Sequence, residues 1–95
     1  MEFEWDPVKD IENRRKHGIT FEEAETVFDD DLGNAFPDPD HSFDEERFLI
    51  VGNSSKLRLL IVSYAERSGV YRIISARPLT RAERRQYEAS IKRPN

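Results

Sequence analysis

Three apolar runs in the second half of the chain constrain the fold most: "RFLIVG" (47–52), "LRLLIVSY" (57–64) and "VYRIISAR" (70–77). Each is rich in β-branched and aromatic residues, and the runs are separated by the turn-like segments "NSSK" and "AERSG". Strands joined by connections this short pair as an antiparallel meander. The middle run is apolar on both faces, which predicts a central strand that is covered on both sides.

The first third of the chain predicts a short strand and two helices. The strand is "FEW" (3–5), and Asp6 before a proline has the pattern of a helix N-cap. This helix is expected to run to about His17 and to end at Gly18, which can take the left-handed conformation. Thr20 and Glu23 have capping-box spacing and predict the start of a second helix.

A third helix is predicted at the C-terminus, and a further short strand at 32–36. Pro78 ends the last long strand, and Thr80 with Glu83 forms another capping-box pattern that opens a helix to about Ile91. Two helices ahead of a meander indicate a small α+β domain, an antiparallel sheet packed with two N-terminal helices and one C-terminal helix. At 95 residues the chain is expected to form a single domain over 1–95, with 92–95 as a loose tail.

Charge is distributed unevenly along the chain. From Arg67 onward eight Lys or Arg face two Glu, a net of +6, whereas the first 66 residues hold seven basic and seventeen acidic groups, a net of −10. Arg72 and Arg77, five residues apart on one strand, are expected on opposite faces. Arg77 and the nearby helix form a guanidinium cluster that suits phosphate and therefore nucleic acid; the helix contributes Arg81, Arg84 and Arg85. The alternative is a solvated helix face.

Two histidines are the candidates for proton transfer near neutral pH. His17 either does this or donates to a free carbonyl at its helix end, and His41 either does this or is a solvated loop residue. His41 lies within residues 29–46, which carry eight carboxylates and no basic group. That segment is interpreted either as a docking surface for a basic partner or as an acidic loop.

Several classes of function are excluded by what the sequence lacks. There is no cysteine, which excludes disulfides and thiolate metal sites, and there is no glycine-rich phosphate loop. The acidic segment lacks the ligand rhythm of a calcium-binding EF-hand. No metal or cofactor is expected. The acidic N-terminus does not look like a signal peptide, and no apolar run approaches the ~20 residues of a membrane span, which predicts a cytoplasmic protein.

Three segments in order resemble the BrnT toxin family: "FEWDPVKDIENRRKHGITFEEAETVF", "FPDPDHSFDEERFLIVGNSS" and "YRIISARPLTRAERRQYE". The resemblance covers about Glu4 to Glu88. It implies a RelE-like fold and an endoribonuclease toxin that cuts RNA and slows growth. It also implies neutralisation by a BrnA-like ribbon-helix-helix antitoxin, and contact with DNA only through the toxin–antitoxin complex.

The resemblance and the chemistry of RNA cleavage together suggest roles for individual residues. Arg77 and Arg72 are expected to bind phosphate and the transition state, with His41, His17 and Glu46 as candidates for proton transfer. The substrate-binding candidates are Lys16, Arg81, Arg84, Arg85 and Tyr87. Which residue acts as the general base stays open at this stage.

Two other functions remain possible from the sequence. A toxin-fold protein without cleavage activity could act only as a binding module with a DNA-binding partner in transcriptional autoregulation. An ordinary acidic interaction protein would show no salt-sensitive binding to RNA.

Overall fold

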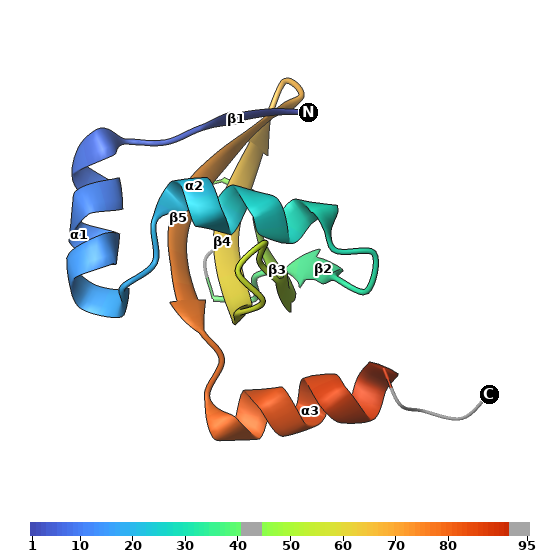
Figure 1. Cartoon of the computed structure of the whole chain (residues 1–95). Coiled ribbons are helices and arrows are strands. Elements are labelled where there is room, and N and C mark those ends of the chain that lie inside the picture. The colour runs from blue at the N-terminus through green and yellow to red at the C-terminus, as the bar shows by residue number, and fades with distance from the viewer. Residues whose placement is uncertain (41–44, 92–95) are drawn as a thin grey trace.

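The computed structural model describes residues 1–40 and 45–91, and its elements follow the predicted order (Figure 1). The three long strands and three helices expected from the sequence are all present. The elements are β1 Glu2–Glu4, α1 Pro7–His17, α2 Phe21–Thr26, the 3₁₀ turn η1 Val27–Asp29, β2 Asn34–Pro37, β3 Arg47–Asn53, β4 Leu59–Arg67, β5 Val70–Pro78 and α3 Arg81–Ile91. The predicted tail at 92–95 lies outside the described residues.

The strands form one five-stranded sheet in the order β1-β5-β4-β3-β2. β2, β3, β4 and β5 pair with one another in antiparallel fashion, which confirms the meander, and β4 is central as predicted. β1 differs from the expected antiparallel sheet because it pairs parallel to β5. A strand that reaches the meander through two helices can enter the edge in either direction. β4 also extends to Arg67, so the segment predicted as the turn "AERSG" is strand for most of its length.

The helices lie on both faces of the sheet. α2 packs against the main core, in which Phe21, Val27, Leu60, Val62 and Ile73 are almost completely buried, and α1 lies beside β5. α3 belongs to a smaller cluster on the opposite face; its buried members are Val51, Leu59 and Tyr87. Figure 1 shows α2 crossing the sheet and α3 standing apart near the end of β5. α2 therefore packs on the larger core on one face, and α3 packs on the smaller cluster on the other.

Most of the predicted helix caps are confirmed. The Asp6 carboxylate accepts from the backbone N–H of Val8 at 2.9 Å, and Gly18 takes a left-handed φ of 73°. At α3 the capping box is complete: the Thr80 hydroxyl accepts from the N–H of Glu83, and the Glu83 carboxylate accepts from the N–H of Thr80. α3 therefore has a fixed N-terminal turn even though its body packs on few residues.

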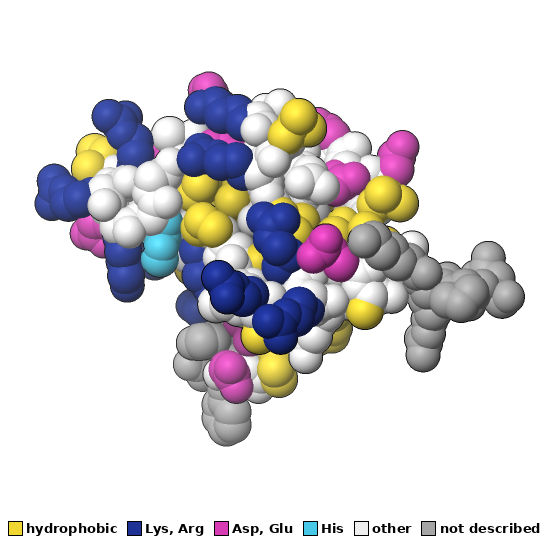
Figure 2. All heavy atoms as spheres, turned by 60° about the horizontal axis from the view of Figure 1, so that its bottom comes forward, with side chains coloured by type: hydrophobic (Ala, Val, Ile, Leu, Met, Phe, Trp, Pro, Cys, Tyr) yellow, Lys and Arg dark blue, Asp and Glu magenta, His cyan; other side chains and the backbone are white. Residues whose placement is uncertain are grey.

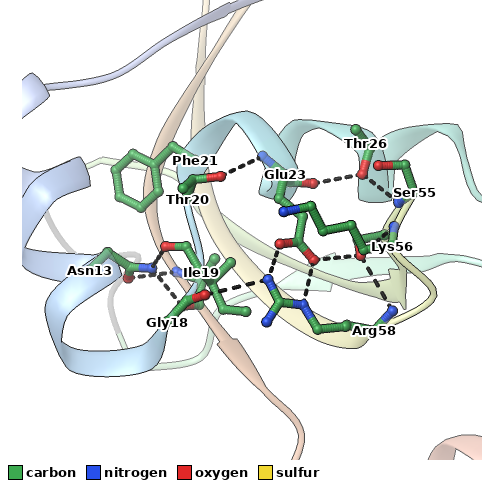
Figure 3. A network of polar contacts seen from close by, with 12 residues as sticks. Asn13, Gly18, Ile19, Thr20, Phe21, Glu23, Thr26, Ser55, Lys56 and Arg58 are labelled. Atoms are coloured by element: carbon green, nitrogen blue, oxygen red, sulfur yellow. Dashed lines mark hydrogen bonds and ion pairs between the residues drawn. The ribbon is translucent and has the colours of Figure 1, made fainter.

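The second capping box is only half formed. The Thr20 hydroxyl accepts from the N–H of Glu23 as predicted, but the Glu23 side chain does not return to Thr20. Glu23 is buried and instead forms an ion pair with Arg58 and accepts a hydrogen bond from the Ser54 hydroxyl (Figure 3). This pair holds the pKa of Glu23 below its usual value. A strong charge partner from the β3–β4 hairpin outcompetes the local backbone N–H.

Asn13 ties α1 to the edge of β5 that β1 leaves open. β1 pairs only with residues 70–72 of β5. Farther along, the buried Asn13 amide accepts from the N–H of Ala76 at 3.0 Å and donates to the carbonyls of Ala76 and Ile19 at 2.9 and 2.8 Å. One side chain thus satisfies backbone groups that a neighbouring strand would otherwise satisfy.

Candidate active site on the open face of the sheet

A β-bulge in β5 decides where the arginines of this strand lie. Ser63 of β4 pairs with Ser75 of β5, but the next residue, Tyr64, pairs with Ile73, so Ile74 is an extra residue in β5. The extra residue shifts the alternation by one. Arg77 and Arg72 pair with Ile61 and Ala65 of β4, which share one face. The expectation that the two arginines lie on opposite faces is therefore wrong.

The face that carries Arg77 is the one opposite α2, and it is hollowed. A hollow of about 310 Å³ lies across β3, β4 and β5. Arg47 comes from β3, Ser63 from β4, and Ser75 and Arg77 from β5. Acidic groups line it as well, in the form of Asp38 and Asp40, which follow β2. Two guanidinium groups and two hydroxyls are donors suited to a phosphate.

A second hollow, of about 220 Å³, adjoins the first. Its lining includes Lys16 and His17 from the last turn of α1. It shares Ile74 and Ser75 with the first hollow. Because Ile74 is the bulge residue, the irregularity of β5 lies where the two hollows meet. The cations and the imidazole of α1 and the arginines of the sheet thus line hollows with two residues in common.

The Arg77 guanidinium is held by α3. It donates to both carboxylate oxygens of Glu83 at 2.8 and 2.9 Å and to the carbonyl of Pro78 at 3.2 Å. Arg77 and the Thr80 N–H hold the pKa of Glu83 at about 2, below its usual value of 4.5. A guanidinium has five N–H groups. Within residues 1–40 and 45–91, the other two N–H groups of Arg77 form no hydrogen bond.

The other predicted cations lie on the outside of α3. Lys and Arg side chains gather on the face seen in Figure 2, and the exposed members from α3 are Arg81, Arg84 and Arg85. Tyr87, expected to bind substrate, is instead buried between α3 and the sheet, and its hydroxyl donates to the Leu32 carbonyl at 3.2 Å. Burial raises its pKa. It lies on the helix face with Glu83 and Ser90, which line the same groove between α3 and the sheet.

The remaining predicted residues lie apart from the hollow. Arg72 forms an ion pair with Glu4 of β1, with nitrogen and oxygen 3.4 Å apart, and does not line either hollow. Glu46 is exposed just before β3. His41 lies outside the described residues. Among residues 1–40 and 45–91, no three His, Asp or Glu side chains gather as ligands of a metal ion would.

Sequence reasoning assigned no catalytic or binding role to Arg47, Ser63, Ser75, Asp38 or Asp40, although the segments that resemble the BrnT family contain all of them except Ser63. Their signal was weak, because each is an ordinary polar residue at a strand end or within an apolar run. Alternation in the meander could have placed Ser63 on the face opposite the core residues Val62 and Tyr64. The pairing of Ser63 with Ser75, however, lies next to the bulge, and no residue pattern in the sequence predicts the position of the bulge.

The comparisons with known proteins identify the family and the fold. Residues 5–83 match the family described as the ribonuclease toxin BrnT of type II toxin–antitoxin systems. The chain belongs to the BrnT family. A solved structure of the Brucella abortus ribonuclease toxin BrnT has the same fold, with a TM-score of 0.67 and 23% identity over 85% of this chain and 99% of that chain. No curated protein matches the chain.

Membership of the BrnT family makes this chain a ribonuclease toxin of a type II toxin–antitoxin system, with RNA as substrate and an antitoxin as partner. Within the described part of the chain, no helix has the length and apolar character to cross a membrane.

Proposed function

We propose that this BrnT family member is a metal-independent endoribonuclease of the mRNA interferase type, acting in the cytoplasm, and that the hollowed face of the sheet is its active site. One observation carries this proposal. Two hollows that share Ile74 and Ser75 are lined by Lys16 and His17 from α1 in one case and by Arg47 and Arg77 from the sheet in the other. Phosphate binders and a titratable imidazole are the groups that RNA cleavage without a metal requires.

The RNA backbone is proposed to run along the two hollows. Arg77 and Arg47 bind the scissile phosphate from two sides, since β4 lies between their strands. The hydroxyls of Ser63 and Ser75 add neutral donors between them. Lys16 binds a neighbouring phosphate, while the α3 arginines provide a diffuse positive field that raises affinity without selecting sequence. Arg72, which pairs with Glu4 away from the hollows, is proposed to contribute only to this field.

The chemistry is an in-line transfer within the RNA. A general base removes the proton from the 2′-hydroxyl, and the 2′-oxygen forms a bond to phosphorus. The bond from phosphorus to the 5′-oxygen breaks, and a general acid protonates that oxygen. The products are a 2′,3′-cyclic phosphate and a 5′-hydroxyl. Arg77 and Arg47 stabilise the charge that builds on the phosphorane.

His17 is the proposed proton-transfer group among the described residues, because it lines the hollow that reaches Ser75. His41 and Glu46 remain predictions for the complementary step. Asp40, at the rim of the sheet hollow, is an additional candidate for the base.

The partner is proposed to be a BrnA-like antitoxin of the ribbon-helix-helix class. In this scheme the free toxin slows growth by cutting RNA, and the antitoxin masks it. Contact with DNA then comes only through the antitoxin. These statements rest on the family resemblance, and the positive charge of the exposed α3 arginines is compatible with them.

The test is cleavage of a long single-stranded RNA by the purified protein in EDTA, with product ends mapped. Arg77→Ala is compared with Arg15→Ala, an exposed arginine of α1 that lines neither hollow. We expect 2′,3′-cyclic ends, and a loss of about a hundredfold in rate for Arg77→Ala alone. If no RNA is cut, with or without ribosomes, the ribonuclease proposal fails and the non-catalytic binding module takes its place.

A further inference from the structure

β2 forms an open edge of the sheet. It is the last strand in the order, and all four of its residues, Asn34–Pro37, are exposed. The N–H of Asp38 donates to the Arg47 carbonyl at 2.8 Å. Hydrogen-bonded positions alternate along an antiparallel ladder, so Phe36 bonds to β3 while Ala35 directs its N–H and C=O outward. Ala35 therefore offers one donor and one acceptor to an added strand.

An apolar groove runs beside this edge. It measures about 270 Å³ and separates β2 from α3; Phe36, Val51, Leu79 and Tyr87 are among its lining residues. Phe36 pairs with Leu49 on the same face of the sheet as the groove. A strand added along β2 would place every second side chain on that face, beside a phenylalanine that is 38% exposed. The groove thus has the position needed to accept alternate apolar residues.

Carboxylates flank the edge at both ends. Asp29 and Asp31 precede β2, Asp40 follows it, and all three are exposed. The sequence has no Lys or Arg between residues 29 and 46. This field attracts a basic segment. Asp40 is shared with the hollow proposed to bind RNA, whereas Asp29 and Asp31 line neither substrate hollow. The open edge therefore suits a positively charged segment, whereas the exposed arginines of α3 suit a negatively charged ligand.

We propose that the edge of β2 and the adjoining groove bind an extended segment of the neutralising protein partner. The segment adds to the sheet as a strand, places alternate apolar side chains in the groove, and carries Lys or Arg at its ends. Main-chain hydrogen bonds supply affinity, and the groove and flanking charges supply specificity. The inference rests on the proposed function only in requiring a neutralising partner.

The first experiment titrates the isotope-labelled protein with a synthetic peptide that has an alternating Val-Thr centre and two Lys at each end. Amide chemical shifts are followed by NMR. We expect shifts at β2 and along the groove, and binding at least ~10-fold weaker for the same peptide with Glu at its ends. Equal binding of the two peptides, shifts confined to other surfaces, or no binding by either peptide would overturn the proposal. So would shifts at β2 on adding single-stranded RNA.

A pair of variants tests strand addition itself. Ala35→Pro removes the outward N–H and leaves the bonds between β2 and β3 intact, whereas Ala35→Val keeps the N–H. With an unchanged thermal midpoint, Ala35→Pro should bind the Lys-ended peptide at least ~10-fold more weakly, and Ala35→Val should bind it as the wild type does. Equal affinity for both variants would contradict pairing along this edge.

These results are independent of the ribonuclease test. Peptide binding is measured without RNA, and neither variant alters a residue that lines the two proposed substrate hollows. A protein that binds the peptide but cuts no RNA would contradict the proposed function alone. A protein that cuts RNA but ignores the peptide would contradict the strand-addition proposal alone.

Discussion

The polar side chains on the two faces of the sheet differ in burial and in their partners. On the face covered by α2 and at the adjoining edge of β5, polar groups are buried and matched to partners: Asn13 satisfies Ala76, and Glu23 pairs with Arg58. On the other face the main polar side chains line open hollows, and Arg77 is held by a single helix turn. The same residue types therefore stabilise the fold on one face and remain available to a ligand on the other.

The largest effect is expected from the covered face. Asn13→Ala leaves the N–H and C=O of Ala76 and the carbonyl of Ile19 without their partner. Each buried unsatisfied group costs about 1–3 kcal/mol, so we expect a loss of about 3 kcal/mol or more in the free energy of unfolding. Urea unfolding measures this, with the exposed neighbour Glu12→Ala as control. A loss below about 1 kcal/mol would mean that Asn13 does not close the edge of β5.

On the open face, Arg47→Ala should change activity and leave stability nearly intact. Arg47 lines the hollow and is paired only at its Nε with Glu45, at 3.3 Å, among the interactions seen in the described residues. Removing one donor to a transition-state charge costs about a hundredfold in rate, or ~2.7 kcal/mol. Single-turnover cleavage and urea unfolding are measured on the same sample. Full activity in Arg47→Ala would exclude β3 from the site.

Glu23→Ala tests the buried ion pair. Arg58 keeps part of its side chain in solvent and can be rehydrated, so the cost is smaller than for a fully buried pair. We expect about 2 kcal/mol in the free energy of unfolding, and less than about 0.5 kcal/mol for the exposed neighbour Glu22→Ala. RNA cleavage per folded molecule should stay unchanged, because the pair lies on the covered face. Equal losses in the free energy of unfolding for Glu23→Ala and Glu22→Ala would mean that the buried ion pair does not stabilise the fold.

Glu83→Gln tests the contact between α3 and Arg77. The pKa of Glu83 is lowered from 4.5 to about 2, so its stabilising effect is complete above 4.5 and is lost as the pH falls toward about 2. Glu83→Gln should cost about 1 kcal/mol at neutral pH, and the difference from wild type should vanish over that acidic range. Urea midpoints across the range measure it. A difference that does not change with pH would contradict the pairing.

The smallest effect concerns the exposed arginines of α3. The double change Arg84→Ala and Arg85→Ala should weaken binding of single-stranded RNA uniformly across sequences. The slope of log affinity against log salt should fall by about 0.7 for each phosphate that these arginines neutralise in the wild type. Fluorescence anisotropy over a salt series measures this. An unchanged slope would mean that these arginines lie away from the RNA.

The fold was largely predictable because its signals are local. Apolar runs gave the strands, and Asp6, Gly18 and Thr80 marked helix ends through contacts within a few residues. The parallel direction of β1 was not predictable. Two helices separate this short strand from the rest of the sheet, and its residues do not indicate the direction in which it pairs. Glu23 was placed wrongly because its partner Arg58 is thirty-five residues away in the chain.

The candidate site was predictable only in part. Positive charge selected Arg77, imidazole chemistry selected His17, and the resemblance to the BrnT family selected Lys16; all three line hollows that share Ile74 and Ser75. The bulge at Ile74 set the face of Arg72 and the pairing of Ser63 with Ser75, and it arises from the register of two strands. Periodicity assumes regular strands, and it fails where one residue is inserted.

The most direct test of the central claim is where RNA contacts the protein. A short oligonucleotide with 2′-deoxy sugars cannot form the cyclic product, so it can be titrated into labelled protein while amide shifts are recorded. We predict shifts that centre on Ser63, Ser75, Arg47 and Arg77 and extend to His17, with α2 and the β3–β4 hairpin unaffected. Shifts centred on α2 or that hairpin, with the open face silent, would contradict the account.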